Sequence, residues 1–370
     1  MTLGWTLRVS PRAHPEHFRE LSGGKLIQSE RISPPVMPTA ETIVGAYVSP
    51  LLCDTHTHGR MGFSVTDSLD TLKELLKATR ASGVGRVQLS TVTLPREELV
   101  ATLSTARNLV EMEESVIGIH LEGPFLSLEK RGAHAKEFIV YGTLDDVKFL
   151  VEPFLDIISS ITLDPLSVAP GAIEWLVENG VTVAIGHTIA TYGETREAFL
   201  AGASVLTHAF NAMRPISSRE PGPVAAALES GAWIEVICDG HHVDPVNVKL
   251  LAEHAGDRLL LVTDSMPAAG LGDGSFFLGG VSVSVTDGIA MTHDGSLAGS
   301  TLSLDEAVSR SVTWGVPADI ALAAATINPL KAYRQNVPTL SSGEPADFLV
   351  WSDEMRVTHM VRGGIVTTSA

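Results

Sequence analysis

Short apolar runs recur along the middle of the chain, and each is followed by a polar turn and a segment with helical periodicity. This alternation is typical of buried parallel strands and of the helices that connect them. Residues 69–80 and 96–110 carry apolar side chains at positions i, i+3, i+4 and i+7, which predicts helices with one face against a sheet. The pattern predicts eight strands, at Val48–Asp54, Arg86–Val92, Val116–Leu121, Ile157–Leu163, Thr182–Ile185, Val205–Thr207, Ile234–Cys238 and Leu259–Thr263.

Eight strand–helix units over roughly 270 residues predict a (β/α)8 barrel of the TIM type, which we place at residues 48–334 with Leu304–Gly315 as its last major helix. A doubly wound sheet is the alternative. Such a sheet usually carries a glycine-rich phosphate turn after an early strand, and no G-x-G-x-x-G motif follows the first strand here. The barrel is therefore the favoured fold.

The two ends of the chain lack this alternation. Residues 1–47 and 335–370 contain short β-type pieces such as Trp5–Val9 and Asp347–Trp351, which predict one small β-sandwich domain built from both termini. Residues 266–300 are rich in glycine and in β-branched clusters, and they predict a hairpin inserted after the eighth strand.

Composition narrows the class of protein. A chain with 44% hydrophobic and 19% charged residues is globular, and no apolar stretch approaches the ~20 residues of a membrane helix. The first residues lack the basic-then-apolar layout of a signal peptide, so we expect a cytoplasmic protein. The formal charge of −17 excludes nucleic acid and anionic membranes as general partners. Cys53 and Cys238 are the only cysteines, so a metal site must use histidine and carboxylate ligands.

Histidines and carboxylates gather where the predicted strands end, which is where a barrel of this type holds its active site. His56 and His58 follow the first strand, and their i, i+2 spacing lets both face the barrel axis and bind one ion while Thr57 points outward. Three further side chains end other strands and can complete a neighbouring metal position; they are Glu122, His187 and His208. This ligand set suits zinc, with iron, manganese or cobalt as alternatives.

Asp264 follows the eighth strand, and the residues after it do not open a periodic helix that it could cap. A carboxylate beside a metal site can accept a proton from water and return it to a leaving group, so we predict that Asp264 is a general acid/base.

His120 precedes Glu122 by two residues and is expected to support the ligands rather than bind metal. One of His241 and His242 should face the cavity, and the sequence favours neither. No chemistry is assigned to His14, His17, His254, His293 or His359.

Taken together, these motifs resemble those of the amidohydrolase superfamily and, within it, the N-acetylglucosamine-6-phosphate deacetylases. The resemblance covers the whole predicted barrel, and a carboxyl-terminal segment, Gly343–Asp347, is similar to the family as well. The motifs follow the family's order and are His56–Gly59, His120–Phe125, Lys130–His134, Gly186–Thr188, Thr207–Met213, Arg219–Gly222, Asp239–His242 and Thr263–Met266.

The resemblance implies hydrolysis of the N-acetyl group of N-acetylglucosamine 6-phosphate, giving glucosamine 6-phosphate and acetate in amino-sugar recycling. It implies that Glu122, His187 and His208 hold the principal metal and that Asp264 is the acid/base. His134 is implied to contact the sugar and orient the carbonyl. The residues implied to bind the sugar phosphate are Asn211, Ala212, His242 and, from the neighbouring subunit of a homodimer, Arg219.

Several alternatives stay open from the sequence. Some relatives lack the H-x-H pair, whereas His56 and His58 are present here, so one or two zinc ions can bind. Lys130 and Arg131 lie in a loop near the site and are expected to be solvated, and which of them contacts the substrate stays open. N-acetylgalactosamine 6-phosphate is an alternative substrate. An amidohydrolase that uses a carboxylated lysine is disfavoured because the fourth strand ends without lysine, and an inactive scaffold is disfavoured because every proposed ligand is retained.

Overall fold

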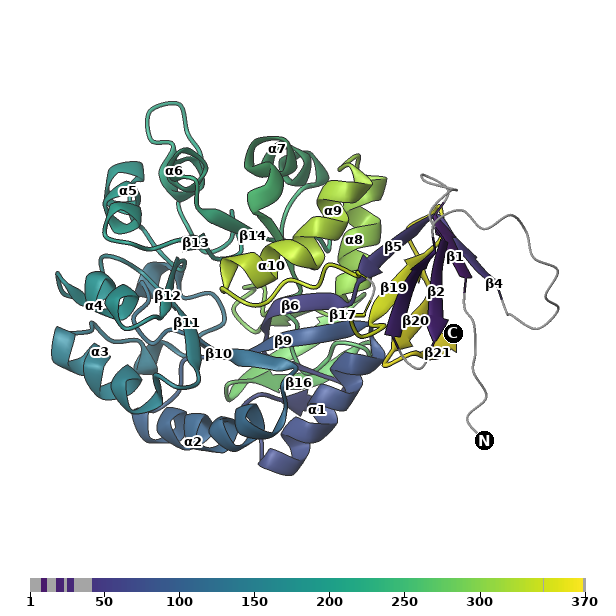
Figure 1. Cartoon of the computed structure of the whole chain (residues 1–370). Coiled ribbons are helices and arrows are strands. Elements are labelled where there is room, and N and C mark those ends of the chain that lie inside the picture. The colour runs from purple at the N-terminus through teal and green to yellow at the C-terminus, as the bar shows by residue number, and fades with distance from the viewer. Residues whose placement is uncertain (1–7, 12–17, 23–24, 30–41, 342, 369–370) are drawn as a thin grey trace. The chain divides into compact units, whose positions relative to one another are not determined.

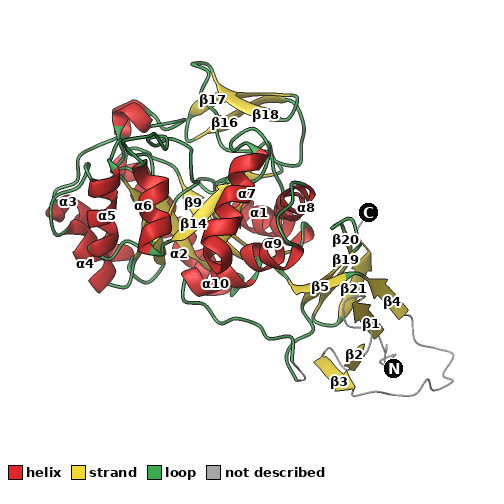
Figure 2. Ribbon diagram, turned by 90° about the horizontal axis from the view of Figure 1, so that it is seen from above, coloured by secondary structure: helices red, strands yellow, loops and turns green. Residues whose placement is uncertain are grey.

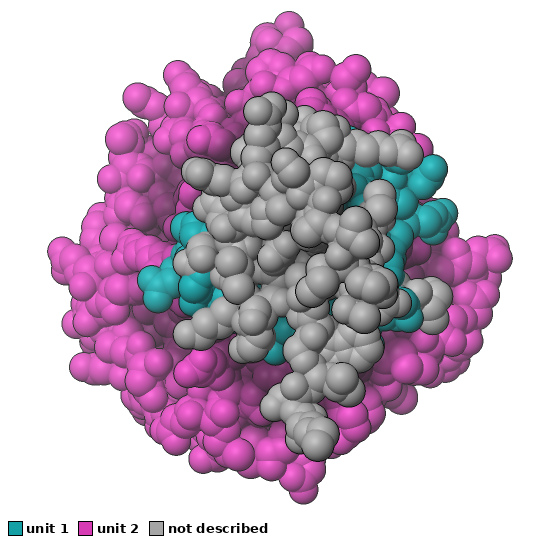
Figure 3. Space-filling view, turned by 45° about the vertical axis from the view of Figure 1, so that its right-hand side comes forward, with its two compact units in different colours: residues 1–52, 336–370 teal, residues 53–335 magenta. Residues whose placement is uncertain are grey.

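The structure is a computed structural model, and it describes residues 8–11, 18–22, 25–29, 42–341 and 343–368. The chain divides into two compact units, residues 1–52 with 336–370 and residues 53–335, which Figure 3 colours separately. Part of the predicted Trp5–Val9 piece, together with His14 and His17, lies outside the described residues.

Eight parallel strands form the sheet of the larger unit, in the order β15-β14-β13-β12-β11-β10-β9-β6. Their side chains are buried almost throughout, because helices cover the outside of the sheet and the strands face one another inside it (Figure 1). The predicted (β/α)8 barrel is confirmed. The strands are β6 (Leu52–Thr57), β9 (Val84–Thr91), β10 (Val116–Glu122), β11 (Ile158–Leu163), β12 (Thr182–Ile185), β13 (Val205–Leu206), β14 (Trp233–Ile237) and β15 (Leu259–Val262).

Side chains link the first and the last strand of this sheet. Thr57 and Ser265 form a parallel bridge, and their hydroxyl oxygens lie 2.7 Å apart. The hydroxyl of Thr263 donates to Asp54 Oδ2 at 2.6 Å. The barrel is therefore nearly closed, and the ends of β6 and β15 lie side by side.

The connecting helices have the amphipathic pattern expected from the sequence. In α1, Leu72, Leu75 and Leu76 are buried, and the Ser68 hydroxyl caps its first turn by accepting from the Thr71 amide. The helices are α1 (Leu69–Ala81), α2 (Arg96–Met112), α3 (Leu144–Val151), α4 (Ala172–Glu178), α5 (Tyr192–Leu200), α6 (Gly222–Ser230), α7 (Pro245–Ala255), α8 (Leu304–Thr313), α9 (Ala318–Ala325) and α10 (Ile327–Ala332), with short 3-10 turns at Leu128–Lys130, Lys136–Phe138, Glu152–Phe154 and Gly256–Arg258.

The first predicted strand is wrong in one respect, because the single run Val48–Asp54 belongs to two strands. β5 (Tyr47–Pro50) pairs antiparallel with β19 (Phe348–Trp351), whereas β6 begins the barrel. Pro50 ends β5, since proline has no N–H with which to continue a ladder. A continuous apolar run does not reveal that its two halves have different hydrogen-bonding partners.

The segment after β15 forms a small antiparallel sheet of three strands rather than a two-stranded hairpin. These are β16 (Gly274–Leu278), β17 (Val281–Thr286) and β18 (Ile289–Thr292). Figure 2 shows the three strands at one end of the barrel, where they stand apart from the ring of helices.

Both ends of the chain contribute strands to the smaller unit, as the sequence predicted. One four-stranded sheet has the order β3-β2-β1-β4, and the other has the order β21-β20-β19-β5. The second sheet has a core of Ala346, Phe348, Val350 and Val361. The strands not yet given are β1 (Arg8–Pro11), β2 (Phe18–Ser22), β3 (Lys25–Ser29), β4 (Thr42–Gly45), β20 (Val357–Arg362) and β21 (Ile365–Thr368), with β7 (Gly59–Arg60) and β8 (Phe63–Ser64) as a short pair in the larger unit.

Among the described helices, none combines the length with the apolar composition that a membrane span requires.

Candidate active site

A cavity of about 290 Å³ opens where the barrel strands end. Such a position is the usual active site of a (β/α)8 barrel. Most of the site residues predicted from the sequence line it, and they are His58, Glu122, His134, His187, His208, Asn211, Ala212, His242 and Asp264. The remaining two are His56, which is fully buried beside His58, and Arg219, which is exposed outside this cavity.

Glu122, His187 and His208 form the first candidate metal group. Glu122 is the last residue of β10, and the two histidines follow β12 and β13. Glu122 Oε1 lies 3.2 Å from Nε2 of each histidine, and the two Nε2 atoms are 3.0 Å apart. Three buried ligand atoms from three strands therefore meet at one point.

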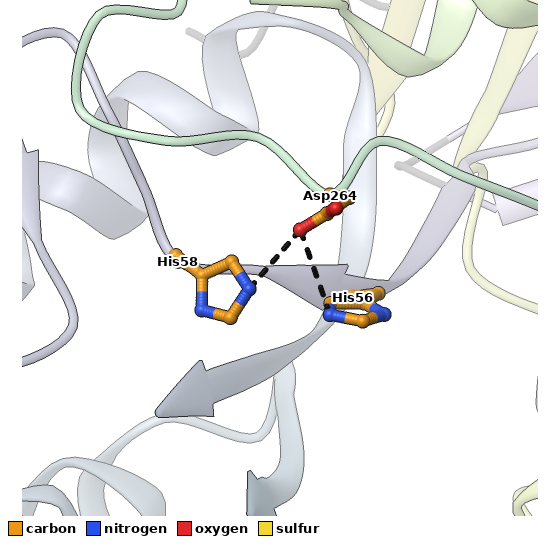
Figure 4. Close-up of side chains that lie close together, drawn as sticks. All are labelled: His56, His58 and Asp264. Atoms are coloured by element: carbon orange, nitrogen blue, oxygen red, sulfur yellow. Dashed lines mark ion pairs between the residues drawn. The ribbon is translucent and has the colours of Figure 1, made fainter. Parts of the chain in front are cut away.

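His56, His58 and Asp264 form a second group, which Figure 4 shows. His58 Nε2 lies 3.1 Å from Asp264 Oδ1, and His56 Nε2 lies 3.6 Å from the same oxygen. Glu122 connects the groups, because its two oxygens lie 3.5 Å from His56 Nε2 and 3.2 Å from His58 Nε2. The two groups are thus halves of one continuous cluster.

The hydrogen bonds of the rings show which nitrogens are free to bind an ion. His187 Nδ1 lies 2.7 Å from the Lys130 carbonyl oxygen, and His58 Nδ1 lies 3.1 Å from that of Ser90. A carbonyl oxygen can only accept, so each Nδ1 carries a proton, and each ring in its neutral form directs an Nε2 lone pair into the cluster. Buried His56 Nε2 makes no hydrogen bond to any residue that the structure describes. Lone pairs and carboxylates that converge in this way fit a divalent cation.

The electrostatics of the cluster agree with this fit. Burial lowers the pKa of His58, but the carboxylates of Asp264 and Glu122 outweigh it and raise the pKa to about 9. Burial raises the pKa of Glu122, but the charge on His56 and the hydrogen bonds from histidines hold that pKa well below its ordinary value. The cluster therefore attracts positive charge, which either protons or metal ions can supply.

Three of these residues have backbone angles that are rare outside glycine. The φ angles of His187, His208 and Asp264 are 47°, 27° and 48°. Left-handed backbone costs free energy for such side chains, and it persists where surrounding bonds hold it. The Asp264 carbonyl, for example, accepts from the Ser300 amide at 2.7 Å, and its amide donates to the His56 carbonyl at 2.8 Å. Sharp turns at the strand ends thus direct these side chains inward.

A family model described as the amidohydrolase family matches residues 47–366. This chain belongs to the amidohydrolase family. Amidohydrolases are metal-dependent, in agreement with the two candidate groups.

The relatives of this amidohydrolase include deacetylases of two amino-sugar phosphates. An N-acetylgalactosamine-6-phosphate deacetylase of Escherichia coli O157:H7 is 36% identical over 332 residues, which cover 85% of each chain. An N-acetylglucosamine-6-phosphate deacetylase of Bacillus subtilis (strain 168) is 34% identical over 298 residues, which cover 77% of this chain and 75% of the relative.

A solved structure of such a deacetylase is also similar to this chain. A variant of N-acetyl-D-glucosamine-6-phosphate deacetylase from Mycobacterium smegmatis, in complex with N-acetyl-D-glucosamine-6-phosphate, superimposes with a TM-score of 0.88 at 30% identity. The match covers 99% of this chain and 100% of that one.

His134 presents a hydrogen-bond donor to the cluster of this amidohydrolase. The Thr93 amide donates to its Nδ1 at 3.1 Å, so the ring proton lies on Nε2, which is 3.3 Å from Glu122 Oε2. Burial lowers the pKa of His134 to about 4, which keeps the ring neutral at pH 7. His134 therefore offers an N–H group and no charge.

His242 differs from His134 because a carboxylate faces its ring. Its Nδ1 lies 2.6 Å from Asp239 Oδ2. Burial lowers the pKa of His242, but Asp239 raises it by more, so the net shift is upward. His241 is exposed while His242 lines the cavity, which decides between the two histidines that the sequence left open.

The other residues considered from the sequence make contacts of different kinds; they are Asn211, Lys130, Arg131, His120 and Thr57. The side chain of Asn211 donates to two carbonyls of its own loop, those of His208 and Ala209. Lys130 lines the cavity, whereas Arg131 forms an ion pair with Asp294 of the loop after β18. Both nitrogens of His120 contact hydroxyl groups, of Ser90 and Thr162. Thr57, expected to point outward, contacts Ser265 at the barrel seam.

Sequence reasoning missed Glu235, which lies in β14 and is 1% exposed. Its carboxylate lies 3.1 Å from His56 Nδ1. The sequence did contain an indication of this position, because Glu235 is the one charged residue in the otherwise apolar run Trp233–Ile237. Glutamate is almost never buried without a partner, so this position could have been identified as part of a polar site.

Proposed function

We propose that this amidohydrolase removes the N-acetyl group of N-acetyl-D-glucosamine 6-phosphate, giving D-glucosamine 6-phosphate and acetate in amino-sugar catabolism. The observation that supports this most is the meeting of Glu122, His187 and His208 with Asp264 at one cavity, on a chain whose relatives are named as amino-sugar-phosphate deacetylases. The phosphorylated substrate agrees with the cytoplasmic location expected from the sequence.

The residues that would hold metal follow from the two groups. Glu122, His187 and His208 would bind the principal ion, and His56 and His58 with Asp264 would bind a second. We propose zinc, because imidazole and carboxylate ligands in a buried site suit it. When bound, a divalent cation polarises an amide carbonyl and lowers the pKa of water from ~16 to about 7.

Asp264 would carry the proton transfers. Burial raises its pKa, but the neighbouring His56 and His58 lower it by more, so the net shift is strongly downward and the carboxylate is ionised at neutral pH. It can therefore accept a proton from the attacking water and deliver it to the sugar nitrogen as the C–N bond breaks. His134 would donate its Nε2–H to the carbonyl oxygen of the acetyl group as negative charge develops there.

The phosphate needs positive charge in an otherwise acidic protein. His242, with its raised pKa, is one source, and Asn211 and Ala212 line the same cavity. Arg219 is exposed in the loop between β13 and α6. We propose that it reaches the phosphate in the neighbouring subunit of a homodimer, since a guanidinium fork suits phosphate oxygens.

N-acetylgalactosamine 6-phosphate is a second candidate substrate, favoured by a relative of that activity at 36% identity. The two sugars differ at one hydroxyl group. Acetate release from both phosphates and from both unphosphorylated sugars would separate the proposals, with the Asp264→Asn variant as the control for contaminating activity. We expect the highest kcat/KM on N-acetylglucosamine 6-phosphate. Absence of acetate release from every sugar by zinc-loaded protein would overturn the proposal.

A further inference from the structure

Glu235 lies behind both candidate metal groups without belonging to either. Its side chain is 2% exposed and comes from the middle of β14, where its neighbours are apolar. A buried carboxylate is costly unless donors surround it. An apolar residue would fill the same place in a strand at lower cost, so the contacts of Glu235 need an explanation.

Three donors from three parts of the barrel surround this carboxylate. Its Oε2 lies 3.1 Å from His56 Nδ1 and 3.4 Å from the backbone nitrogen of His208. Its Oε1 accepts from the hydroxyl of Tyr333 at 3.2 Å. The carboxylate thus contacts the side chain of one candidate ligand and the backbone of another.

The contact with His56 determines which nitrogen of that ring faces the cluster. A carboxylate beside Nδ1 favours the tautomer with its proton on Nδ1. His56 Nε2 is then a lone-pair donor. Within the described part of the chain it makes no hydrogen bond, and it lies 3.5 Å from Glu122 Oε1 and 3.6 Å from Asp264 Oδ1. Glu235 thereby prepares His56 for an ion.

The contact with His208 acts on the backbone. His208 has a φ of 27°, and the next residue, Ala209, donates its amide to the Glu235 carbonyl at 2.8 Å. The side chain and the main chain of Glu235 therefore both hold the turn that aims His208 at Glu122. The rings of His56 and His208 stack with centroids 5.7 Å apart, so the two supported ligands are themselves neighbours.

We propose that Glu235 is a positioning residue for both metal groups, which fixes the tautomer of His56 and the turn of His208. This inference rests on the metal site of the proposed function and not on the identity of the sugar. It predicts that Glu235 controls metal affinity, because partners that orient ligands typically change affinity by about 10–100-fold.

The first experiment compares Glu235→Gln with the wild type by elemental analysis and by zinc competition against a chromogenic chelator. Glutamine keeps the shape but not the charge. We expect zinc affinity at the His56 group to fall by about 10–100-fold, and the bound zinc per chain to fall with it. Tyr333→Phe is the matched control, since it removes a donor to the same carboxylate while keeping the charge beside His56, and it should retain the wild-type zinc content.

The second experiment needs no variant at Glu235. In zinc-loaded wild-type protein labelled with ¹⁵N-histidine, the ring nitrogens of His56, assigned with a His56→Gln variant, should show a protonated Nδ1 and an Nε2 that carries no proton. The opposite tautomer would overturn the inference, even if Glu235→Gln does not fold. Unchanged zinc affinity in folded Glu235→Gln would overturn it too.

The outcomes also separate this inference from the proposed function. Wild-type protein that binds no divalent ion would overturn both. Normal zinc binding by the wild type, lost in Glu235→Gln, supports the role of Glu235 even if no acetylated sugar is a substrate.

Discussion

Nε2 of His187 and Nε2 of His208 lie 3.0 Å apart, and both face the same oxygen of Glu122. His187 donates through Nδ1 to the Lys130 carbonyl, so in the neutral ring its Nε2 is a lone pair. Two ring nitrogens and a carboxylate oxygen at these distances repel one another unless positive charge lies among them. A bound cation should therefore increase the stability of the native fold.

Removal of metal is expected to destabilise the protein. A ligand that binds only the folded chain adds about 3–4 kcal/mol when its concentration is 100 to 1,000 times its Kd. Protein dialysed against a chelator should unfold at a lower temperature in calorimetry, and added zinc should restore the original transition. Magnesium is the control ion, because it prefers oxygen ligands and should restore little. Equal unfolding temperatures for protein verified as metal-free and as zinc-loaded would contradict this prediction.

Asp264→Asn should reduce kcat by about 10²–10⁴-fold, because the amide cannot accept and return a proton. The ion at Glu122, His187 and His208 should remain, since Asp264 belongs to the other group. Acetate release and elemental analysis on the same preparation check both statements. Asp257→Asn, on the exposed 3-10 turn Gly256–Arg258 before β15, is the control. Near-normal turnover in Asp264→Asn would remove Asp264 from the mechanism.

Most of the site residues could be predicted from the sequence because they directly follow predicted strands. Parallel strands in a barrel bring their carboxyl ends to one face, so a histidine or carboxylate after a strand could be assigned to the cavity without knowing its distance from the others. This reasoning grouped Glu122 with His187 and His208, and His56 with His58, and it predicted Asp264 separately as the acid/base. The structure places Asp264 beside His56 and His58.

The rest depended on contacts that no local pattern encodes. Glu235 acts from the middle of a strand, so a search of strand ends overlooked it. The choice between His241 and His242 depends on how one turn folds over Asp239, whose Oδ1 accepts both of their amides at 2.8 Å. The division of the first apolar run into β5 and β6 depends on β19, which lies about 300 positions later in the chain and supplies the pairing partner of β5.

Lys130→Ala should raise KM for the phosphorylated sugar and leave KM for the unphosphorylated sugar unchanged. Lys130 lines the cavity, and a charge-assisted contact to phosphate corresponds to about 10–100-fold in affinity. Lys136→Ala, on an exposed turn of the same segment, should have neither effect. An equal rise of KM for both sugars would show that Lys130 shapes the cavity and does not bind phosphate.

A mixing experiment tests whether Arg219 serves the neighbouring subunit. In a heterodimer of Arg219→Ala and Asp264→Asn chains, the site that keeps Asp264 would receive Arg219 from its partner. Random 1:1 assembly should then restore about a quarter of wild-type activity, with the wild-type KM. If Arg219 acted within its own chain, one site of the heterodimer would lack Arg219 and the other would lack Asp264. The mixture would then show only the summed activity of the two defective proteins. Co-expression with two affinity tags isolates the heterodimer for this assay.

Asp54 should make the stability of this barrel depend on pH. Burial raises its pKa from 3.8 to about 6, although the side chain and amide of Thr263 lower it. The folded chain thus holds the Asp54 proton more tightly than the unfolded chain, so Asp54 contributes stability at pH 4 that is lost as the pH rises through 6. Relative to Asp54→Asn, the wild type should gain about 2–3 kcal/mol in unfolding free energy between pH 7.5 and pH 4. Urea denaturation of both proteins in chelator measures this difference, and a difference that does not change with pH would show that buried Asp54 stays ionised.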